Sequence, residues 1–303
     1  MSLKPQPEMA AILREQQAVP AIDYRRMPIA EARLAFERTW AMWNKPLPEM
    51  AGRNLTIGGM SCRLTDPEVA STGLIVFVHG GGWTFGSPES YERFARLLAG
   101  DAACPVLMPD YRLAPEHACP AAIEDVLAVL RGLAAVEDPV LRRTLSIVLA
   151  GDSAGANIAL AAALEPGCPR LAALLLVYGC FEPRFDTQSH RDCGDGRFGL
   201  MTERMRWYWS NWQGAAHDPR AVPPAADLPG LPHTYVMAAG LDPLRDDSTT
   251  LAARLAAAGV SVRLDVVPGV VHGFLQMSSR LAPARQAIET IARESRAAVG
   301  ETR

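Results

Sequence analysis

Short apolar runs recur along the chain, and between them apolar residues are spaced as on one face of a helix. The runs are rich in Val, Ile and Leu and predict buried strands, whereas the helical spacing predicts amphipathic helices. The predicted strands cover residues 74–78, 106–108, 146–150, 172–178, 234–238 and 260–267, and the predicted helices cover 88–99, 121–133, 157–164, 246–258 and 284–298. Apolar strands that alternate with helices are typical of a mostly parallel sheet with helices on both faces. We therefore expect an α/β fold.

The first part of the chain, residues 1–50, predicts helices that are set apart from this sheet. Ile29, Phe36, Trp40 and Trp43 recur there at intervals that place them on one apolar stripe. Such a stripe is typical of a helix packed on the body of a protein. A cap over a binding site is the alternative, because aromatic residues can wall a pocket.

A second segment, residues 182–232, also interrupts the alternation of strands and helices. Thr202 is a candidate helix cap, and the apolar residues after it lie at helical spacing. They are Met205, Tyr208, Trp209 and Trp212. The stripe predicts a helix that faces the core. Because the segment follows a predicted strand, it can also lie over the carboxyl ends of the strands, where ligands bind in open α/β sheets.

Composition excludes several functional classes. The chain has 303 residues, of which 49% are hydrophobic and 21% charged, and its net charge is −3. This balance gives no electrostatic reason to expect a nucleic acid or an anionic membrane as partner. The longest apolar run, residues 171–181, is too short to span a bilayer. The N-terminal segment carries charges and prolines in place of a secretory apolar core, so we expect a cytoplasmic protein.

The cysteines and histidines indicate neither disulfides nor metal. Six cysteines are scattered without a Cys-x-x-Cys pair. Without an export signal, reduced thiols are expected. The six histidines show no pairing at metal-ligand spacing. We therefore expect no metal and no cofactor.

The predicted strand 146–150 runs into Gly151-Asp152-Ser153-Ala154-Gly155, and a helix-forming stretch follows. Strand, tight turn and helix around Gly-x-Ser-x-Gly constitute a nucleophile elbow. A serine hydroxyl is a weak nucleophile, so it needs exposure on a sharp turn and a base within reach. Gly151 and Gly155 remove Cβ atoms where strand and helix crowd the turn.

An acid and a histidine should follow the elbow in chain order. Asp242 and His272 each follow a predicted strand. Both loops therefore lie at the sheet edge that carries Ser153. A neutral imidazole would accept the Ser153 proton, and a carboxylate would fix the imidazole tautomer. Asp246 and Asp247 compete for the role of the acid, and Asp242 could instead cap a turn; its position directly after the strand favours Asp242.

The segment His79-Gly80-Gly81-Gly82-Trp83 directly follows another predicted strand. Consecutive glycines let the backbone approach a substrate closely and direct N–H groups inward, as in the oxyanion-hole loop of lipases and esterases. Together with the Ala154 amide, this loop would hold a tetrahedral oxyanion. A phosphate-binding loop is excluded because no Gly-Lys-Ser/Thr follows. We expect His79 to tether the loop rather than to act as a second base.

These four features together resemble the hormone-sensitive lipase family of α/β-hydrolases. Its members are the bacterial type IV carboxylesterases, and the elbow matches the Gly-Asp-Ser-Ala-Gly subgroup. The resemblance covers about residues 50–300, and its motifs are His79–Trp83, Tyr111–Glu116, Gly151–Gly155, Asp242–Leu244 and His272–Phe274. It implies an α/β-hydrolase fold, with an eight-stranded, mostly parallel sheet, helices on both faces and a helical cap.

The same resemblance implies how the chain is divided. The cap would consist of residues 1–50 and the insertion 182–232. The hydrolase core would consist of residues 51–181 and 233–303.

The resemblance also implies site roles. Ser153 would be the nucleophile, His272 the base and Asp242 the orienting acid. The amides of Gly81, Gly82 and Ala154 would form the oxyanion hole. We further expect Trp83, Asp152 and Phe274 to line the substrate pocket. Two roles stay open for Asp152: it could hold the oxyanion loop or the cap, or it could be a solvated turn carboxylate.

The implied activity is hydrolysis of short-chain acyl esters through an acyl-enzyme, and some relatives form homodimers through an edge strand. An amidase, lactonase or deacetylase could use the same triad on another leaving group. A non-catalytic ligand-binding protein is a further alternative, because fold does not determine function. The presence of Ser153, Asp242 and His272 together favours an enzyme.

Overall fold

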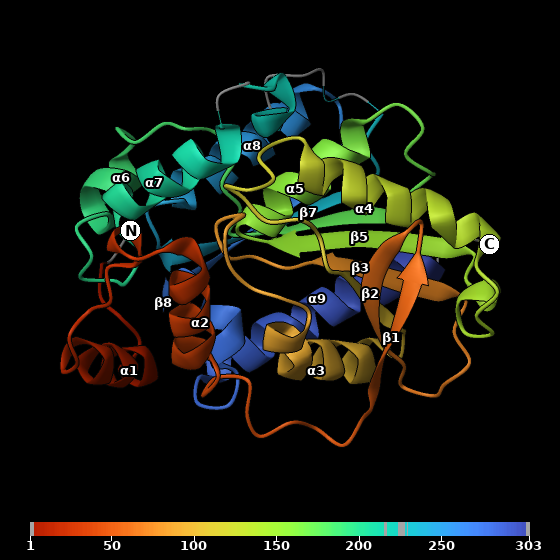
Figure 1. Ribbon diagram of the computed structural model, residues 1–303, viewed down its shortest axis with the longest axis horizontal. Coiled ribbons are helices and arrows are strands. Elements are labelled where there is room, and N and C mark those ends of the chain that lie inside the picture. The colour runs from red at the N-terminus through yellow and green to blue at the C-terminus, as the bar shows by residue number, and fades with distance from the viewer. Residues whose placement is uncertain (1–2, 215–216, 224–227, 229, 301–303) are drawn as a thin grey trace.

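A computed structural model of the protein describes residues 3–214, 217–223, 228 and 230–300 (Figure 1). One sheet of eight strands lies at its centre, in the order β1-β2-β4-β3-β5-β6-β7-β8. The strands are β1 Gly52–Ile57, β2 Met60–Thr65, β3 Gly73–Val78, β4 Val106–Pro109, β5 Ser146–Asp152, β6 Ala173–Val177, β7 Thr234–Leu241 and β8 Val262–Val271. β2 pairs antiparallel with β1 and β4, and the remaining neighbours pair in parallel. The α/β-hydrolase sheet expected from the sequence is thus confirmed.

Helices cover both faces of this sheet (Figure 1). They are α1 Pro7–Gln17, α2 Ile29–Trp40, α3 Glu92–Ala102, α4 Ala121–Gly132, α5 Ala154–Leu164, α6 Gln188–Cys193, α7 Thr202–Gln213, α8 Arg245–Ala257 and α9 Ala282–Gly300. Helices α3 and α9 pack on one face, and α4, α5 and α8 pack on the other. None of the helices described is long and apolar enough to cross a membrane.

The central strands divide their side chains between two cores because successive residues point to opposite faces. In β3, Leu74, Val76 and Val78 join the core shared with α4, α5 and α8. Ile75 and Phe77 join the core shared with α3 and α9. All five are fully buried, which explains why this strand is apolar throughout instead of alternating with polar residues. The carboxyl ends of the parallel strands are therefore held at one edge by two packed layers.

The N-terminal helices and the helices of residues 182–232 lie near each other at one end of the sheet (Figure 1). Arg25, in the short 3-10 helix Tyr24–Arg26, donates to Glu203 of α7 at 3.0 Å. Gln17 of α1 donates to the carbonyl of Arg197 at 3.1 Å. These contacts join the two segments for which a cap is expected, and the division at residues 50, 181 and 232 stays a prediction.

At three places the structure differs from the helices and strands that the local sequence pattern predicts. The apolar runs missed β1 and β2, because these strands carry polar, partly exposed residues at the edge of the sheet. β8 extends to Val271, so that His272 follows it directly. Thr202 does not cap α7: Met201 occupies the N-cap, and the Thr202 hydroxyl lies 2.9 Å from Nδ1 of His190.

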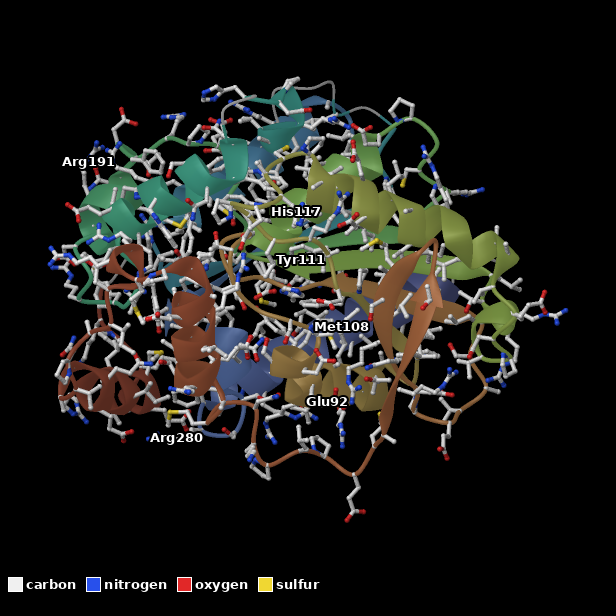
Figure 2. The ribbon with its side chains drawn as sticks, in the orientation of Figure 1. Glu92, Met108, Tyr111, His117, Arg191 and Arg280 are labelled. Carbon is white, nitrogen blue, oxygen red and sulfur yellow. The ribbon has the colours of Figure 1, made fainter. Side chains whose placement is uncertain are left out.

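A buried ion-pair cluster joins β2 to α3. The Glu92 carboxylate at the start of α3 (Figure 2) contacts the guanidinium groups of Arg63 and Arg96. Burial disfavours the Glu92 anion, but the hydrogen bonds from the two arginines outweigh burial and lower the pKa of its carboxyl. The cluster therefore stabilises the fold at neutral pH, and this contribution is lost as the pH falls through the lowered pKa.

We expect Glu92→Ala to lower the free energy of unfolding by roughly 3 kcal/mol, because two partly buried arginines lose their partner. Urea denaturation at neutral pH measures the change. Glu137→Ala is the matched control, since Glu137 pairs with Arg142 while its side chain is 90% exposed. Equal losses in the two variants would show that the Glu92 cluster is not a stabilising element.

Candidate active site

Ser153 lies in a sharp turn between β5 and α5. Its φ of 53° is positive, a strained conformation for a residue with a side chain. A Cβ atom on Gly155 would lie 2.0 Å from the carbonyl oxygen of Val78, and one on Gly151 would lie 2.5 Å from that of Gly155. Only glycine fits at both positions, so the turn has the shape of a nucleophile elbow.

A continuous hydrogen-bond chain leads from Ser153 to a buried carboxylate. The Ser153 Oγ lies 2.8 Å from Nε2 of His272, and Nδ1 of His272 lies 2.7 Å from Oδ2 of Asp242. Asp242 is fully buried, and its other oxygen accepts from the Leu244 amide at 2.9 Å. With the imidazole proton on Nδ1, Nε2 is free to accept the Ser153 hydroxyl proton. The structure thus brings together the three residues that the sequence selected.

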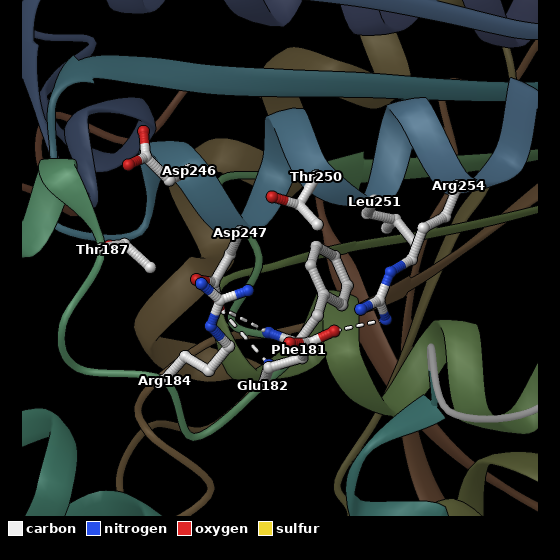
Figure 3. Close-up of a pocket in the computed structure, with 9 residues that line it drawn as sticks. All are labelled: Phe181, Glu182, Arg184, Thr187, Asp246, Asp247, Thr250, Leu251 and Arg254. Atoms are coloured by element: carbon white, nitrogen blue, oxygen red, sulfur yellow. Dashed lines mark hydrogen bonds and ion pairs between the residues drawn. The ribbon is translucent and has the colours of Figure 1, made fainter.

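The competing acids, in the first turn of α8, point elsewhere. Asp246 accepts from the Ser189 amide at 2.8 Å, and Asp247 accepts from the Phe181 amide at 2.9 Å. Burial raises the pKa of the Asp247 carboxyl to about 7. Both carboxylates line a small pocket between α8 and the segment after β6 (Figure 3), and its lining includes none of the triad residues. Asp246 and Asp247 therefore hold the start of the insertion rather than the imidazole.

The loop after β3 is the segment expected to supply oxyanion donors. Gly81 and Gly82 have φ values of 124° and 62°, which side chains disfavour. A Cβ atom on Gly81 would lie 2.0 Å from the Phe85 carbonyl oxygen. Within the described part of the chain, no acceptor is bonded to the Gly81 or Gly82 amide. These two N–H groups, with the unpaired first amide of α5 at Ala154, are available to bind an oxyanion.

Hydrogen bonds fix both peptide groups that flank Gly80. Tyr111 donates its hydroxyl to the His79 carbonyl at 2.7 Å, and the Gly80 amide donates to Asp152 at 2.7 Å. Nδ1 of His79 lies 2.8 Å from the Gly80 carbonyl oxygen and must donate to it. Burial lowers the pKa of His79 to about 4, so this imidazole is neutral at physiological pH. The contacts agree with the expected role of His79 as a tether of the loop.

The three residues predicted to line the substrate pocket are all buried, and their place in that pocket stays a prediction. We call the segment His79–Phe85 the oxyanion loop. The Asp152 carboxylate accepts from the Gly80 amide of this loop and from the hydroxyls of Tyr91 and Tyr178, the last two each at 3.0 Å. Trp83 stacks on Trp212, and Phe274 packs against Tyr178. Because Asp152 is only 1% exposed, it is not a solvated turn carboxylate. It holds the oxyanion loop.

Sequence reasoning missed the tyrosines that complete this arrangement. Tyr178 directly follows β6, at the same edge as the elbow, and this position could have identified it as a residue of the site. Its ring also lies against His272, with centroids 5.0 Å apart. Tyr91 ends the short 3-10 helix Glu89–Tyr91, where no motif marks it. In the described residues, no group of three or more His, Cys, Asp or Glu side chains could hold a metal ion.

Asp152 should make stability depend on pH. Burial raises the pKa of its carboxyl to about 6, although hydrogen bonds from Tyr178, Tyr91 and Gly80 oppose the shift. The folded state therefore binds this proton more tightly than the unfolded state. The resulting stability is present below the unfolded pKa, about 3.9, and is lost as the pH rises through the folded pKa.

Relative to wild type, Asp152→Asn should gain on the order of 2 kcal/mol in unfolding free energy between about pH 4 and pH 7, because asparagine does not titrate. Urea denaturation across this range measures the difference. Asp195→Asn, at a half-exposed carboxylate paired with Arg197, controls for the loss of one charge. A difference from wild type that does not change with pH would contradict the raised pKa.

Comparisons with known proteins agree with this geometry. Residues 75–276 match the model of a family with the alpha/beta hydrolase fold. The carboxylesterase NlhH of Mycobacterium tuberculosis is 34% identical over 257 residues, which cover 80% of this chain and 81% of that protein.

Solved structures of esterases are similar over nearly the whole chain. A hyperthermophilic esterase from the archaeon Pyrobaculum calidifontis superposes with a TM-score of 0.88 at 28% identity, covering 97% of this chain and 98% of that one. A thermostable esterase from Pseudomonas putida gives 0.89 at 26% identity, covering 99% of both chains. An esterase of the bacterial hormone-sensitive lipase family gives 0.85 at 28% identity, covering 99% of this chain and 100% of that one. The chain therefore belongs to the hormone-sensitive-lipase-like family of α/β-hydrolases and is a carboxylesterase.

Proposed function

We propose that this enzyme hydrolyses short-chain carboxylic esters through an acyl-enzyme on Ser153. The observation that carries the proposal is the hydrogen-bond chain from Ser153 Oγ through His272 to Asp242, with distances of 2.8 and 2.7 Å. A serine becomes a useful nucleophile when a base lies within hydrogen-bond reach and a third group orients that base. Both conditions are met at the carboxyl edge of the sheet.

In the acylation step, the Ser153 Oγ attacks the ester carbonyl carbon while Nε2 of His272 takes the hydroxyl proton. The buried Asp242 carboxylate stabilises the imidazolium that forms. The tetrahedral oxyanion accepts hydrogen bonds from the amides of Gly81, Gly82 and Ala154. Collapse breaks the bond to the alkoxide, which takes the proton from His272 and leaves as the alcohol.

Deacylation repeats these steps with water. His272 removes a proton from the water, whose oxygen attacks the acyl carbon, and the same amides bind the second oxyanion. Collapse breaks the bond to Ser153 Oγ, which recovers its proton from His272. The carboxylic acid is released and the enzyme is restored. Each oxyanion donor of this kind lowers the barrier by roughly 3 kcal/mol.

The surroundings of the triad support a preference for small acyl groups. Ser153 is only 8% exposed. The ring of Tyr178 lies against His272, and a Cβ atom on Gly273 would lie 3.4 Å from the ring of Trp40. Bulky rings thus lie beside His272 and Gly273 within the described residues, and we expect a long acyl chain to displace them.

Cellular location and assembly are further parts of the proposal. All six cysteines are free thiols, which supports the cytoplasm as the location. We also propose a homodimer formed through an edge of the sheet. Among the described strands, β1 and β8 are at the edges and present unpaired backbone groups there.

Ser153→Ala should lower kcat/KM on p-nitrophenyl butyrate by about four orders of magnitude or more, because the nucleophile is removed. Initial rates measured by absorbance test this. Ser295→Ala, at another buried serine whose hydroxyl donates to the carbonyl of Ile291, should keep wild-type activity. Turnover that survives in Ser153→Ala would exclude Ser153 as the nucleophile.

The acyl preference is tested on p-nitrophenyl acetate, butyrate, octanoate and palmitate. Because rings crowd the site, kcat/KM should be highest on acetate or butyrate and at least about tenfold lower on palmitate. A maximum on octanoate or palmitate would overturn the short-chain assignment while leaving the triad intact.

A further inference from the structure

One face of helix α7 lies directly on the oxyanion loop. A Cβ atom on Gly82 would lie 2.4 Å from Cδ1 of Tyr208, so the Tyr208 ring rests on the glycine backbone. Tyr208 itself is only 6% exposed. The contact joins a residue of the insertion to one of the amides available for the oxyanion.

The same helix face holds the next residue of the loop. Trp83 stacks on Trp212 with ring planes 3° apart and centroids separated by 5.3 Å. It also packs edge-on against Trp209, with centroids 4.8 Å apart. Trp83 has a φ of 58°, a conformation that a bulky residue adopts only where its surroundings enforce it. The two indoles of α7 hold its side chain, and the bond from the Phe85 amide to the Gly81 carbonyl closes the turn in its backbone.

A third contact continues the series along the loop. Asn211 of α7 donates to the Thr84 hydroxyl at 3.3 Å. Gly82, Trp83 and Thr84 are thus each contacted by a side chain of the same helix. We call the four residues that make these contacts the α7 clasp: Tyr208, Trp209, Asn211 and Trp212.

The hydrolase core fixes the loop elsewhere. It holds the peptide groups around Gly80, and the Ala114 amide donates to the Trp83 carbonyl at 2.8 Å. The peptide group between Gly81 and Gly82 carries the Gly82 N–H, and its carbonyl accepts from the Thr84 amide at 3.2 Å and from the Phe85 amide at 2.9 Å. Its N–H has no bonded acceptor among the described residues. Gly82 has no side chain that could hold its backbone, and the Tyr208 ring packs directly against it.

We infer that Tyr208 is a positioning residue for the oxyanion hole, holding the Gly82 amide in its donating orientation through direct ring contact. The inference rests on the proposed function, in which the Gly82 amide binds the oxyanion. It assigns α7 a role in catalysis that a pocket wall would not have. The contacts of the α7 clasp would then stabilise the transition state and not the bound substrate, because the oxyanion develops only in the transition state.

Kinetics separate the two roles. A residue that only walls the pocket affects substrate binding and changes KM, most strongly for long acyl groups. A residue that positions an oxyanion donor affects kcat and leaves KM nearly unchanged, even for the smallest ester. Acetate is therefore the decisive acyl group, because it extends least toward the cap.

The experiment measures kcat and KM of the full chain on p-nitrophenyl acetate. Tyr208→Ala should lower kcat between about 10- and 100-fold, approaching the loss of one oxyanion donor, with KM changed less than about twofold. Tyr208→Phe should restore kcat to within about twofold of wild type, because the ring is retained and the hydroxyl has no hydrogen-bond partner among the described residues. If Tyr208→Ala fails to fold, Tyr208→Leu allows the same comparison with phenylalanine.

Phe185→Ala is the matched control. Phe185 belongs to the same insertion, where it packs against the His190 ring and under the Arg206 guanidinium, away from the loop. It should keep wild-type kcat, whereas general loosening of the insertion would lower kcat in both variants. Thermal unfolding of each variant reports that loosening directly.

Three results would overturn the inference: wild-type kcat in Tyr208→Ala or Tyr208→Leu, a loss confined to KM, or an equal loss of kcat in Phe185→Ala. Each result leaves the proposed function standing if Ser153→Ala is inactive. Activity that survives in Ser153→Ala would instead remove the proposed function itself. The two failures are therefore distinguishable.

Discussion

The buried carboxylate of Asp152 is the interaction on which the site depends. It accepts hydrogen bonds from Gly80 after β3, from Tyr91 before α3 and from Tyr178 after β6. Asp152 itself ends β5 and directly precedes Ser153, so a single side chain fixes three neighbouring segments relative to that residue. Burying a carboxylate without this set of donors would cost several kcal/mol. The donors make the ion tolerable, and the ion in turn orders the loops that supply them.

Backbone strain is concentrated in the two loops that this carboxylate joins. Ser153 and Trp83 both have positive φ, and each lies beside glycines that no larger residue could replace. Such strain persists only where packing over-determines the conformation. At the elbow, Ser153 connects β5 to α5, and the packing of that strand and helix in the fold enforces its positive φ. At the oxyanion loop, backbone hydrogen bonds to the carbonyls of Gly81 and Trp83 hold the backbone conformation together with the aromatic rings of α7, so that the loop is also in contact with the insertion.

The features that could be predicted from the sequence are those that depend on residues close together in the chain. Apolar runs placed the six strands β3 to β8 and most of their helices, and motif position alone brought Ser153, Asp242 and His272 together. Prediction failed where tertiary contacts decide: β1 and β2 form through pairing at a polar sheet edge, and Asp152 looks like a turn carboxylate until its three donors are known. Trp83 and Phe274 are expected on a pocket wall, which stays a prediction. Their packing on Trp212 and Tyr178, which no motif marks, could not be read from the sequence.

Both segments outside the sheet reach the catalytic loops themselves. Trp40 of α2 lies against Gly273, next to the base, and Tyr208 of α7 lies on Gly82. The ring of Phe85, within the oxyanion loop, stacks on Phe36 of α2 and meets Tyr208 edge-on, so that the two segments share one aromatic cluster. A cap that only admitted or excluded substrate would need no contact with the donor loop. Because these rings pack on residues proposed to bind the oxyanion and to adjoin the base, we expect changes in the two segments that select a different ester to act on the rate of the chemical step as well.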